Sequence, residues 1–159
     1  MRPEVLTWDA RYREDFARLN RAWIEHHFKL EPADQESFAD PHGTFVADGG
    51  EVFFALVDGK VLGTCALRRE PEDGDTYELC KMAVDPEARG LGLGDVLMVA
   101  VLRFAQERSA RRVYLVSNTK LGPALGLYRK HGFVTVREGE AVSREAGYAR
   151  ADIEMERRF

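Results

Sequence analysis

Apolar residues in the first part of the chain recur at the spacing of one helix face. Four large apolar side chains follow one another at intervals of four, three and four positions: Tyr12, Phe16, Leu19 and Trp23. These positions share one side of an α-helix, which predicts an amphipathic helix. Asp9 stands where a helix cap is expected, and residues 5–8 before it form a short strand candidate.

The next stretch predicts a shorter helix and then a series of strands. Pro32 suits the first turn of a helix, and residues 40–43 (DPHG) would end it. EVFFALV and KVLGTCALRRE then flank Asp58-Gly59, a dipeptide typical of a tight hairpin turn. EDGD marks another turn before a further strand, TYELCKMAV, which Asp85-Pro86 would end.

From the glycines at 90–94 onward, helices and strands alternate. One helix face is formed by Leu97, Ala100, Val101 and Phe104. RVYLVS then reads as a strand, residues 121–131 as a short helix stopped by Gly132, and FVTV as a strand. Residues 138–148 read as a loop, and the apolar–charged alternation from Ala149 to Glu156 is typical of a strand with one wet face. This order implies a mixed sheet with helices on its faces, an α/β fold or α+β by stricter counting.

Bulk composition indicates one soluble domain over residues 1–159. Hydrophobic residues make up 45% of the chain and charged residues 31%, which is typical of a domain large enough to bury a hydrophobic core. The net charge of −4 argues against a nucleic-acid partner. No stretch approaches the ~20 apolar residues of a membrane span. The first residues lack the apolar core of a signal peptide, so a cytoplasmic location is expected.

The cysteines and histidines predict no metal site. Cys65 and Cys80 each lie in a strand-like run, without His or Cys companions at ligand spacing, so we expect them to be small buried hydrophobic residues. His26 and His27 are adjacent, and on a helix they would point about 100° apart rather than converge.

Three glycines at alternate positions in EARGLGLGD precede an apolar helix. A Walker loop is excluded because Asp95-Val96 stands where Lys-Ser/Thr is needed, and a dinucleotide fingerprint because its third glycine would fall at Asp95. A strand, a glycine turn and a helix start together present free N–H groups at the positive end of the helix dipole. This favours a phosphorylated cofactor, with Arg89 adding a charged contact; a turn without a ligand is the alternative.

Three segments together resemble the GNAT (Gcn5-related) N-acetyltransferases. Residues 89–94 fit the pattern R/Q-x-x-G-x-G/A, and ELCKMAVDPEARG is similar to the family's fourth strand and its exit. A third segment resembles N…A…LY-x-K-x-GF at Asn118, Ala124, Leu127, Tyr128, Lys130, Gly132 and Phe133. The likeness covers most of the chain, most specifically residues 78–133. It implies a mixed, mostly antiparallel central sheet of about six to seven strands flanked by about four helices.

The resemblance also implies acetyl-CoA as co-substrate and no metal. The main chain of Met82, Ala83 and Val84 would pair with the pantetheine arm, at a bulge that splays this strand from the next. Backbone N–H groups near Met82 would face the thioester carbonyl, and Asn118 would contact the cofactor arm. The residues expected to bind the pyrophosphate are Arg89, Gly90, Leu91, Gly92, Leu93, Gly94 and Asp95.

Two residues are candidates for proton transfer. Glu78 lies in a run that is otherwise largely apolar, where loss of solvation would raise its pKa and suit it as a base. It matches the position of the glutamate in some family members; a salt-bridged carboxylate, or one that only holds a water, is the alternative. Tyr128 matches the family's catalytic tyrosine and would protonate the leaving thiolate. Spacing alone favours a packing aromatic on a short helix.

The resemblance implies an N-acetyltransferase that moves an acetyl group directly to a primary amine in a ternary complex. Its small-molecule or peptide acceptor would lie near residues 138–148 and Trp23, His26, His27, Phe28 and Glu31. For Trp23 and Phe28 a place in the core is favoured over a place in the pocket. Glu25, Glu31, Asp34 and Glu36 either form an acidic entrance or are ordinary solvated charges. A non-catalytic acyl-CoA sensor and an unrelated nucleotide-binding protein are alternatives, and a homodimer is compatible with the sequence.

Overall fold

Hydrogen bonding joins seven strands of the computed structural model, which describes residues 2–159, into one sheet of order β1-β2-β3-β4-β5-β7-β6. The strands are β1 (Glu4–Thr7), β2 (Glu51–Val57), β3 (Lys60–Glu70), β4 (Asp73–Val84), β5 (Arg112–Ser117), β6 (Val134–Glu138) and β7 (Ile153–Arg158). Neighbouring strands run antiparallel except β4 and β5, which are parallel. The mixed, mostly antiparallel sheet is therefore confirmed.

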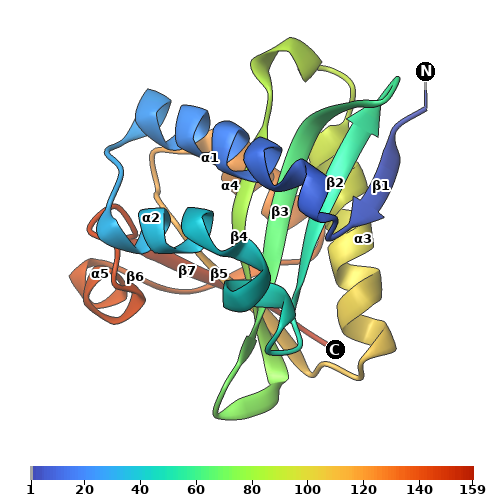
Figure 1. Cartoon of the computed structure of the whole chain (residues 1–159). Helices are drawn as coiled ribbons and strands as arrows, with labels where there is room; N and C mark the ends of the chain where they lie inside the picture. Colours follow the sequence, from blue (N-terminus) through green and yellow to red (C-terminus); the bar gives the residue numbers. More distant parts are fainter. Residues whose placement is uncertain (1) are drawn as a thin grey trace.

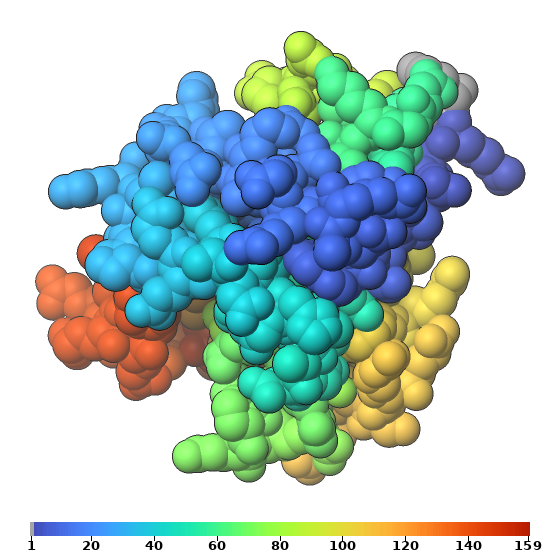
Figure 2. Space-filling model, in the orientation of Figure 1, coloured from blue at the N-terminus to red at the C-terminus, as the bar shows by residue number. Residues whose placement is uncertain are grey.

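Helices cover both faces of this sheet. They are α1 (Arg13–His27), α2 (Pro32–Ala39), α3 (Leu93–Glu107), α4 (Gly122–Lys130) and α5 (Glu140–Ala146), with short turns η1 (Ala10–Tyr12), η2 (His42–Val46) and η3 (Pro86–Ala88). Helices α1 and α2 cross the front of the sheet in Figure 1, and α3 lies behind it. Figure 2 shows the same front face closed by α1, α2 and η2, with the segment of α5 meeting α2 at the left.

The core consists of two apolar layers, one on each side of the sheet. Phe16 of α1, Phe38 of α2 and Phe54 of β2 belong to the cluster on one face. Leu97 of α3 and Leu125 of α4 belong to the cluster on the other face. Strands β2 and β3 are buried on both faces, which explains the continuous apolar run EVFFALV.

Most of the predicted elements are present, with shifted ends. The hairpin at Asp58-Gly59 is confirmed, since both residues have the positive φ (52° and 78°) of a tight hairpin turn. Asp9 caps the short turn η1 rather than α1, because its side chain accepts from the N–H of Arg11. Helix α2 begins at Pro32 as expected.

Three segments differ from the sequence prediction. Residues 42–46 form a π-helical turn where only a break was expected. Residues 140–146 form α5 instead of a loop; this helix is too short to show apolar periodicity and buries only Val142. The last strand begins at Ile153 rather than at Ala149, because Arg150 and Asp152 are held by side-chain bonds to other segments.

Candidate active site

A pocket opens where the parallel strands β4 and β5 separate. Their pairing ends at Glu78 and Tyr114, although β4 continues to Val84 and β5 to Ser117. The pocket between the diverging ends is lined by Asn20, Trp23, Ile24, Phe28, Glu78, Leu79, Cys80, Lys81, Met82, Leu115, Val116, Ser117, Asn118, Leu121, Tyr128, Tyr148, Arg150 and Ala151. Trp23 and Phe28 both line this pocket and pack against the core. Contact of these residues with an acceptor stays a prediction.

A β-bulge in β4 produces the separation. Thr64 of β3 pairs with Ala83 whereas Ala66 pairs with Cys80, so β4 holds one residue more than β3 at this point. Lys81 takes up this irregularity with a left-handed φ of 55°, which is uncommon for a residue with a side chain. The bulge expected near Met82 is therefore present.

The bulge leaves one edge of β4 unpaired. Ala83 and Val84 pair with β3 on one side, and β5 offers no pairing beyond Glu78 on the other. Met82 lies between them and lines the pocket. The free edge of β4 can therefore accept an extended chain by strand addition.

The glycine-rich loop lies between β4 and α3. Gly90 (φ 82°) and Gly92 (φ 72°) have left-handed backbone, and a Cβ on either would meet no atom within 4 Å. Neither of their N–H groups has a protein acceptor among residues 2–159. Helix α3 begins directly after Gly92 with no side-chain cap, so the N–H groups of Leu93, Gly94 and Asp95 add to this set. The loop can therefore bind an anion at the positive end of α3.

The other loop residues differ in their surroundings. Arg89 and Leu91 are exposed, whereas Leu93 is buried. A Cβ on Gly94 would lie 3.0 Å from Cδ2 of Leu127, so this glycine permits close packing of α3 on α4. The carboxylate of Asp95 points to α4, where it pairs with Lys130 at 2.9 Å and His131 at 2.7 Å.

Asn118 lines the pocket, but its side chain already makes two hydrogen bonds. Its Nδ2 donates to the carbonyl of Arg150 at 2.7 Å, and its Oδ1 accepts from the N–H of Lys120 at 3.0 Å. Asn118 thus ties the end of β5 to the segment before β7.

Glu78 lies on the pocket wall within a polar network rather than an apolar one. Its Oε1 accepts from Nε and Nη2 of Arg68 at 3.2 and 2.9 Å. Arg68 also pairs with Glu70, which accepts a hydrogen bond from the hydroxyl of Tyr114. Burial raises the pKa of Glu78, and the charge of Arg68 opposes this shift. Oε2 of Glu78 has no partner among the described residues and is accessible.

Tyr128 approaches the same pocket from α4. Its ring packs against the apolar cluster that contains Phe133, with ring centroids 6.2 Å apart. Its hydroxyl has no hydrogen-bond partner within residues 2–159. Burial raises the pKa of Tyr128 to about 12, so the phenol keeps its proton at neutral pH.

A buried ionic cluster forms a further wall of the pocket. Asp34, fully buried, accepts from Nζ of Lys81 at 2.5 Å and from Nη1 and Nη2 of Arg150 at 2.8 and 2.7 Å. Glu31 pairs with Arg150 at 3.3 Å. Both alternatives for Glu31 and Asp34 were therefore wrong, since these carboxylates form neither an acidic entrance nor a solvated face. Lys81 was visible in the sequence as a charge within an apolar strand; Arg150 carried no such signal.

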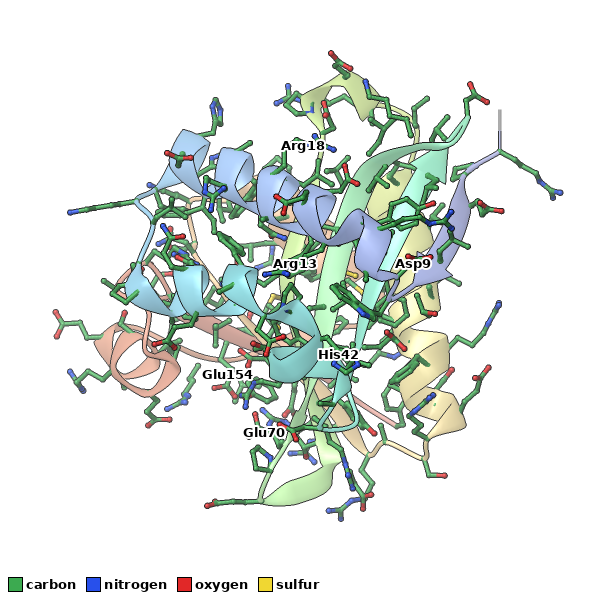
Figure 3. All side chains as sticks on the ribbon, in the orientation of Figure 1. Asp9, Arg13, Arg18, His42, Glu70 and Glu154 are labelled. Atoms are coloured by element: carbon green, nitrogen blue, oxygen red, sulfur yellow. The ribbon has the colours of Figure 1, made fainter. Side chains whose placement is uncertain are left out.

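A second, more polar depression adjoins the pocket. It is lined by charged side chains of β3, β4, β5 and β7, and Glu78 and Val116 line both hollows. Two of its carboxylates, Glu70 and Glu154, are labelled on the lower part of the sheet in Figure 3. Glu78 therefore stands between the two hollows.

The described part of the chain shows neither a metal-binding cluster nor a helix that could cross a membrane. Within residues 2–159, no three His, Cys, Asp or Glu side chains are grouped so that they could hold a metal ion. None of the helices described is long and apolar enough to cross a membrane.

Comparison with known proteins gives one family. The model of the acetyltransferase (GNAT) family matches residues 8–133. Mycothiol acetyltransferase of Saccharomonospora viridis is 34% identical over 113 residues, which are 67% of this chain and 35% of that protein. Human N-acetylaspartate synthetase is 33% identical over 117 residues, 73% of this chain and 36% of that protein. The chain thus matches only about a third of the length of these relatives.

Solved structures share the fold. A GNAT-family acetyltransferase of Staphylococcus aureus has a TM-score of 0.86 at 21% identity, and the match covers 99% of both chains. A phosphinothricin acetyltransferase of Sinorhizobium meliloti in complex with acetyl-CoA has a TM-score of 0.81 at 18% identity, over 100% of this chain and 89% of that one.

Proposed function

Because the chain belongs to the acetyltransferase (GNAT) family, we propose that it transfers the acetyl group of acetyl-CoA to a primary amine, directly and in a ternary complex. The observation that carries this proposal is one pocket that is lined by Glu78, Tyr128 and the bulged edge of β4. The anion-binding glycine loop follows the same strand. We also propose that the acceptor is a small molecule or a peptide.

The residues present fit acetyl-CoA. The open, left-handed backbone at Gly90 and Gly92, with its unpaired N–H groups, would hold the pyrophosphate, and Arg89 would add a charged contact. The free edge of β4 at Met82–Val84 would hold the pantetheine arm. Asn118 would contact this arm, with its side chain held by the hydrogen bonds to Lys120 and Arg150. When bound, acetyl-CoA supplies an acetyl group activated as a thioester.

Glu78 would take the proton of the acceptor amine. The raised pKa brings this carboxylate closer to neutral pH, where a general base is most effective. Arg68 donates two hydrogen bonds to Oε1 and so fixes the orientation of the Glu78 side chain. Oε2 has no hydrogen-bond partner among the described residues and is accessible. The proton passes either directly or through a water held by Glu78.

Tyr128 would supply the proton that the departing thiolate needs. Its hydroxyl is protonated at neutral pH and has no competing partner in the described part of the chain. A backbone N–H near Met82 would stabilise negative charge on the acyl oxygen.

The proposal is tested by measuring release of free thiol from acetyl-CoA in the presence of an amine panel. The panel contains polyamines, amino acids, aminoglycosides, arylamines and peptides with free N-termini or lysines. Thiol release with one class would support the proposal. Binding of CoA without release with any amine would favour the alternative, a non-catalytic acyl-CoA sensor of the same fold.

A further inference from the structure

One wall of the pocket carries two cations beside a phenol. Nζ of Lys81 donates to the hydroxyl of Tyr148 at 2.9 Å. The same Nζ lies 4.6 Å, and the guanidinium carbon of Arg150 4.5 Å, from the centre of the Tyr148 ring. All three side chains line the pocket.

Behind this wall, the carboxylate of Asp34 has no free acceptor position. Oδ1 of Asp34 accepts from Lys81 and Arg150, and Oδ2 accepts from Arg150 and from the N–H of Glu31. Glu31 accepts from Arg150 and from the N–H of Ala149. Neither carboxylate lines the pocket.

The donors of the wall, in contrast, are not all used. Asp34 and Glu31 engage Nη1 and one N–H of Nη2 of Arg150; Nε and the other N–H of Nη2 have no partner within residues 2–159. These two N–H groups form one edge of the planar guanidinium, spaced to match a carboxylate. The hydroxyl of Tyr148 accepts from Lys81, and its own proton has no acceptor in the described part of the chain.

We infer that the acceptor carries a carboxylate close to its amine, and that Arg150 and Tyr148 bind this carboxylate. The inference rests on the proposed function, because it places the amine at Glu78 of the same pocket. Glu78 and Lys81 are three residues apart on β4, at most ~10 Å of strand, so the two groups of the acceptor lie close together. The substrate class is therefore that of amino acids.

Matched pairs of carboxylates and carboxamides test the inference. Glycine, alanine and phenylalanine are compared with their α-carboxamides, and glutamate with glutamine, so that an α-carboxylate is distinguished from a side-chain carboxylate. We expect at least one acid to exceed its amide about 10- to 100-fold in kcat/KM, which is the worth of a charge-assisted hydrogen bond. Calorimetric binding of the same pairs in the presence of CoA gives a readout that needs no turnover.

Two variants test whether Tyr148 and Arg150 cause the preference for acids over amides. Tyr148→Phe keeps the ring beside the cations and removes the hydroxyl with its free O–H donor. Arg150→Lys keeps a positive charge for Asp34 and removes the guanidinium edge. Each variant should lower the ratio of kcat/KM for the acid to kcat/KM for its amide several-fold. This ratio does not depend on the fraction of the protein that is folded. Tyr12→Phe, a tyrosine outside the pocket, should leave it unchanged.

The outcomes separate this inference from the proposed function. Preferential binding of an acid without acetyl transfer would support the inference and contradict the transferase. Acetyl transfer at equal rates to acids and their amides would support the transferase and contradict the inference. An equal response to acid and amide in every pair, including no binding of either, would overturn the inference.

Discussion

The two residues proposed to move protons lie in contrasting surroundings. Tyr128 packs against apolar side chains, and its hydroxyl has no hydrogen-bond partner in the described part of the chain. Glu78 is held by Arg68 next to a polar hollow. Burial raises the pKa of both groups, which favours the protonated phenol as acid and brings the carboxylate closer to neutral pH as base.

Replacing Tyr128 by phenylalanine tests the acid. We expect Tyr128→Phe to lower kcat about tenfold or more, because proton donation to the leaving group is lost while packing is retained. The KM for acetyl-CoA should stay within about twofold, since the hydroxyl contributes little to ground-state binding. The measurement is steady-state thiol release, with Tyr12→Phe as the matched control. An unchanged kcat would exclude Tyr128 as the acid.

Replacing Glu78 by glutamine tests the base through pH. A base acts only when ionised, so kcat/KM of the natural chain should fall as pH drops through the raised pKa of Glu78. Glutamine does not ionise, and Glu78→Gln should lower the rate about 100-fold and remove this acid limb. Glu36→Gln, an exposed change on α2, is the control. Profiles of the same shape for natural chain and Glu78→Gln would contradict the base.

At the scale of elements, the site depends on two departures from regular geometry. The bulge at Lys81 frees one edge of β4, and the left-handed Gly92 starts α3 with open N–H groups. The glycine is visible in the sequence because few other residues adopt this backbone. The bulge carries no such signal, since Lys81 is not a residue that favours a positive φ.

Gly92→Ala tests the anion-binding loop. A Cβ at φ 72° strains the backbone of the loop that is proposed to hold the pyrophosphate. We expect KM for acetyl-CoA to rise about tenfold or more, with a smaller change in kcat. Gly126→Ala in α4 is the matched control: it has no left-handed φ and no close neighbour, and should be neutral or stabilise by about 0.5–1 kcal/mol. Equal KM values for the natural chain and Gly92→Ala would contradict the role of the loop.

At the scale of the whole molecule, Asp34 connects segments that are far apart in the sequence. It joins α2 to β4 through Lys81 and to the segment before β7 through Arg150. This buried link holds one wall of the pocket in place.

Asp34→Asn tests the link. Removing the charge of Asp34 leaves Lys81 without a carboxylate partner and Arg150 with Glu31 alone, and we expect the free energy of unfolding to fall by about 3–5 kcal/mol. Burial would raise the pKa of Asp34, but hydrogen bonds from Arg150 and Lys81 outweigh it and lower the pKa from 3.8 to about 2. The stabilisation is therefore complete above pH 3.8 and is lost as pH falls to about 2.

Urea unfolding at several pH values measures both effects. The difference between natural chain and Asp34→Asn should be constant near neutral pH and shrink below pH 3.8. Glu36→Gln on the exposed face of α2 should change stability by less than about 0.5 kcal/mol. A small, pH-independent loss for Asp34→Asn would show that the cluster does not stabilise the fold.

The sequence by itself determined the features that depend on local chemistry. Apolar periodicity predicted α1 and α3, the Asp58-Gly59 turn predicted the hairpin, and the glycines predicted the loop before α3. Family resemblance added the bulge and the candidate residues Glu78 and Tyr128, whose roles stay predictions. These features could be predicted because each is encoded in residues that are close together in the chain.

Only the tertiary structure decided which distant side chains meet. Glu78 was expected among apolar neighbours, but β3 brings Arg68 beside it. Asp34 was expected in solvent or at an entrance, but α2 buries it against Lys81 and Arg150. Such pairs lie 10 to 116 residues apart, and no local pattern specifies them. The charge that surrounds a site is set by packing across the sheet, whereas the elements that carry the site are set by local sequence.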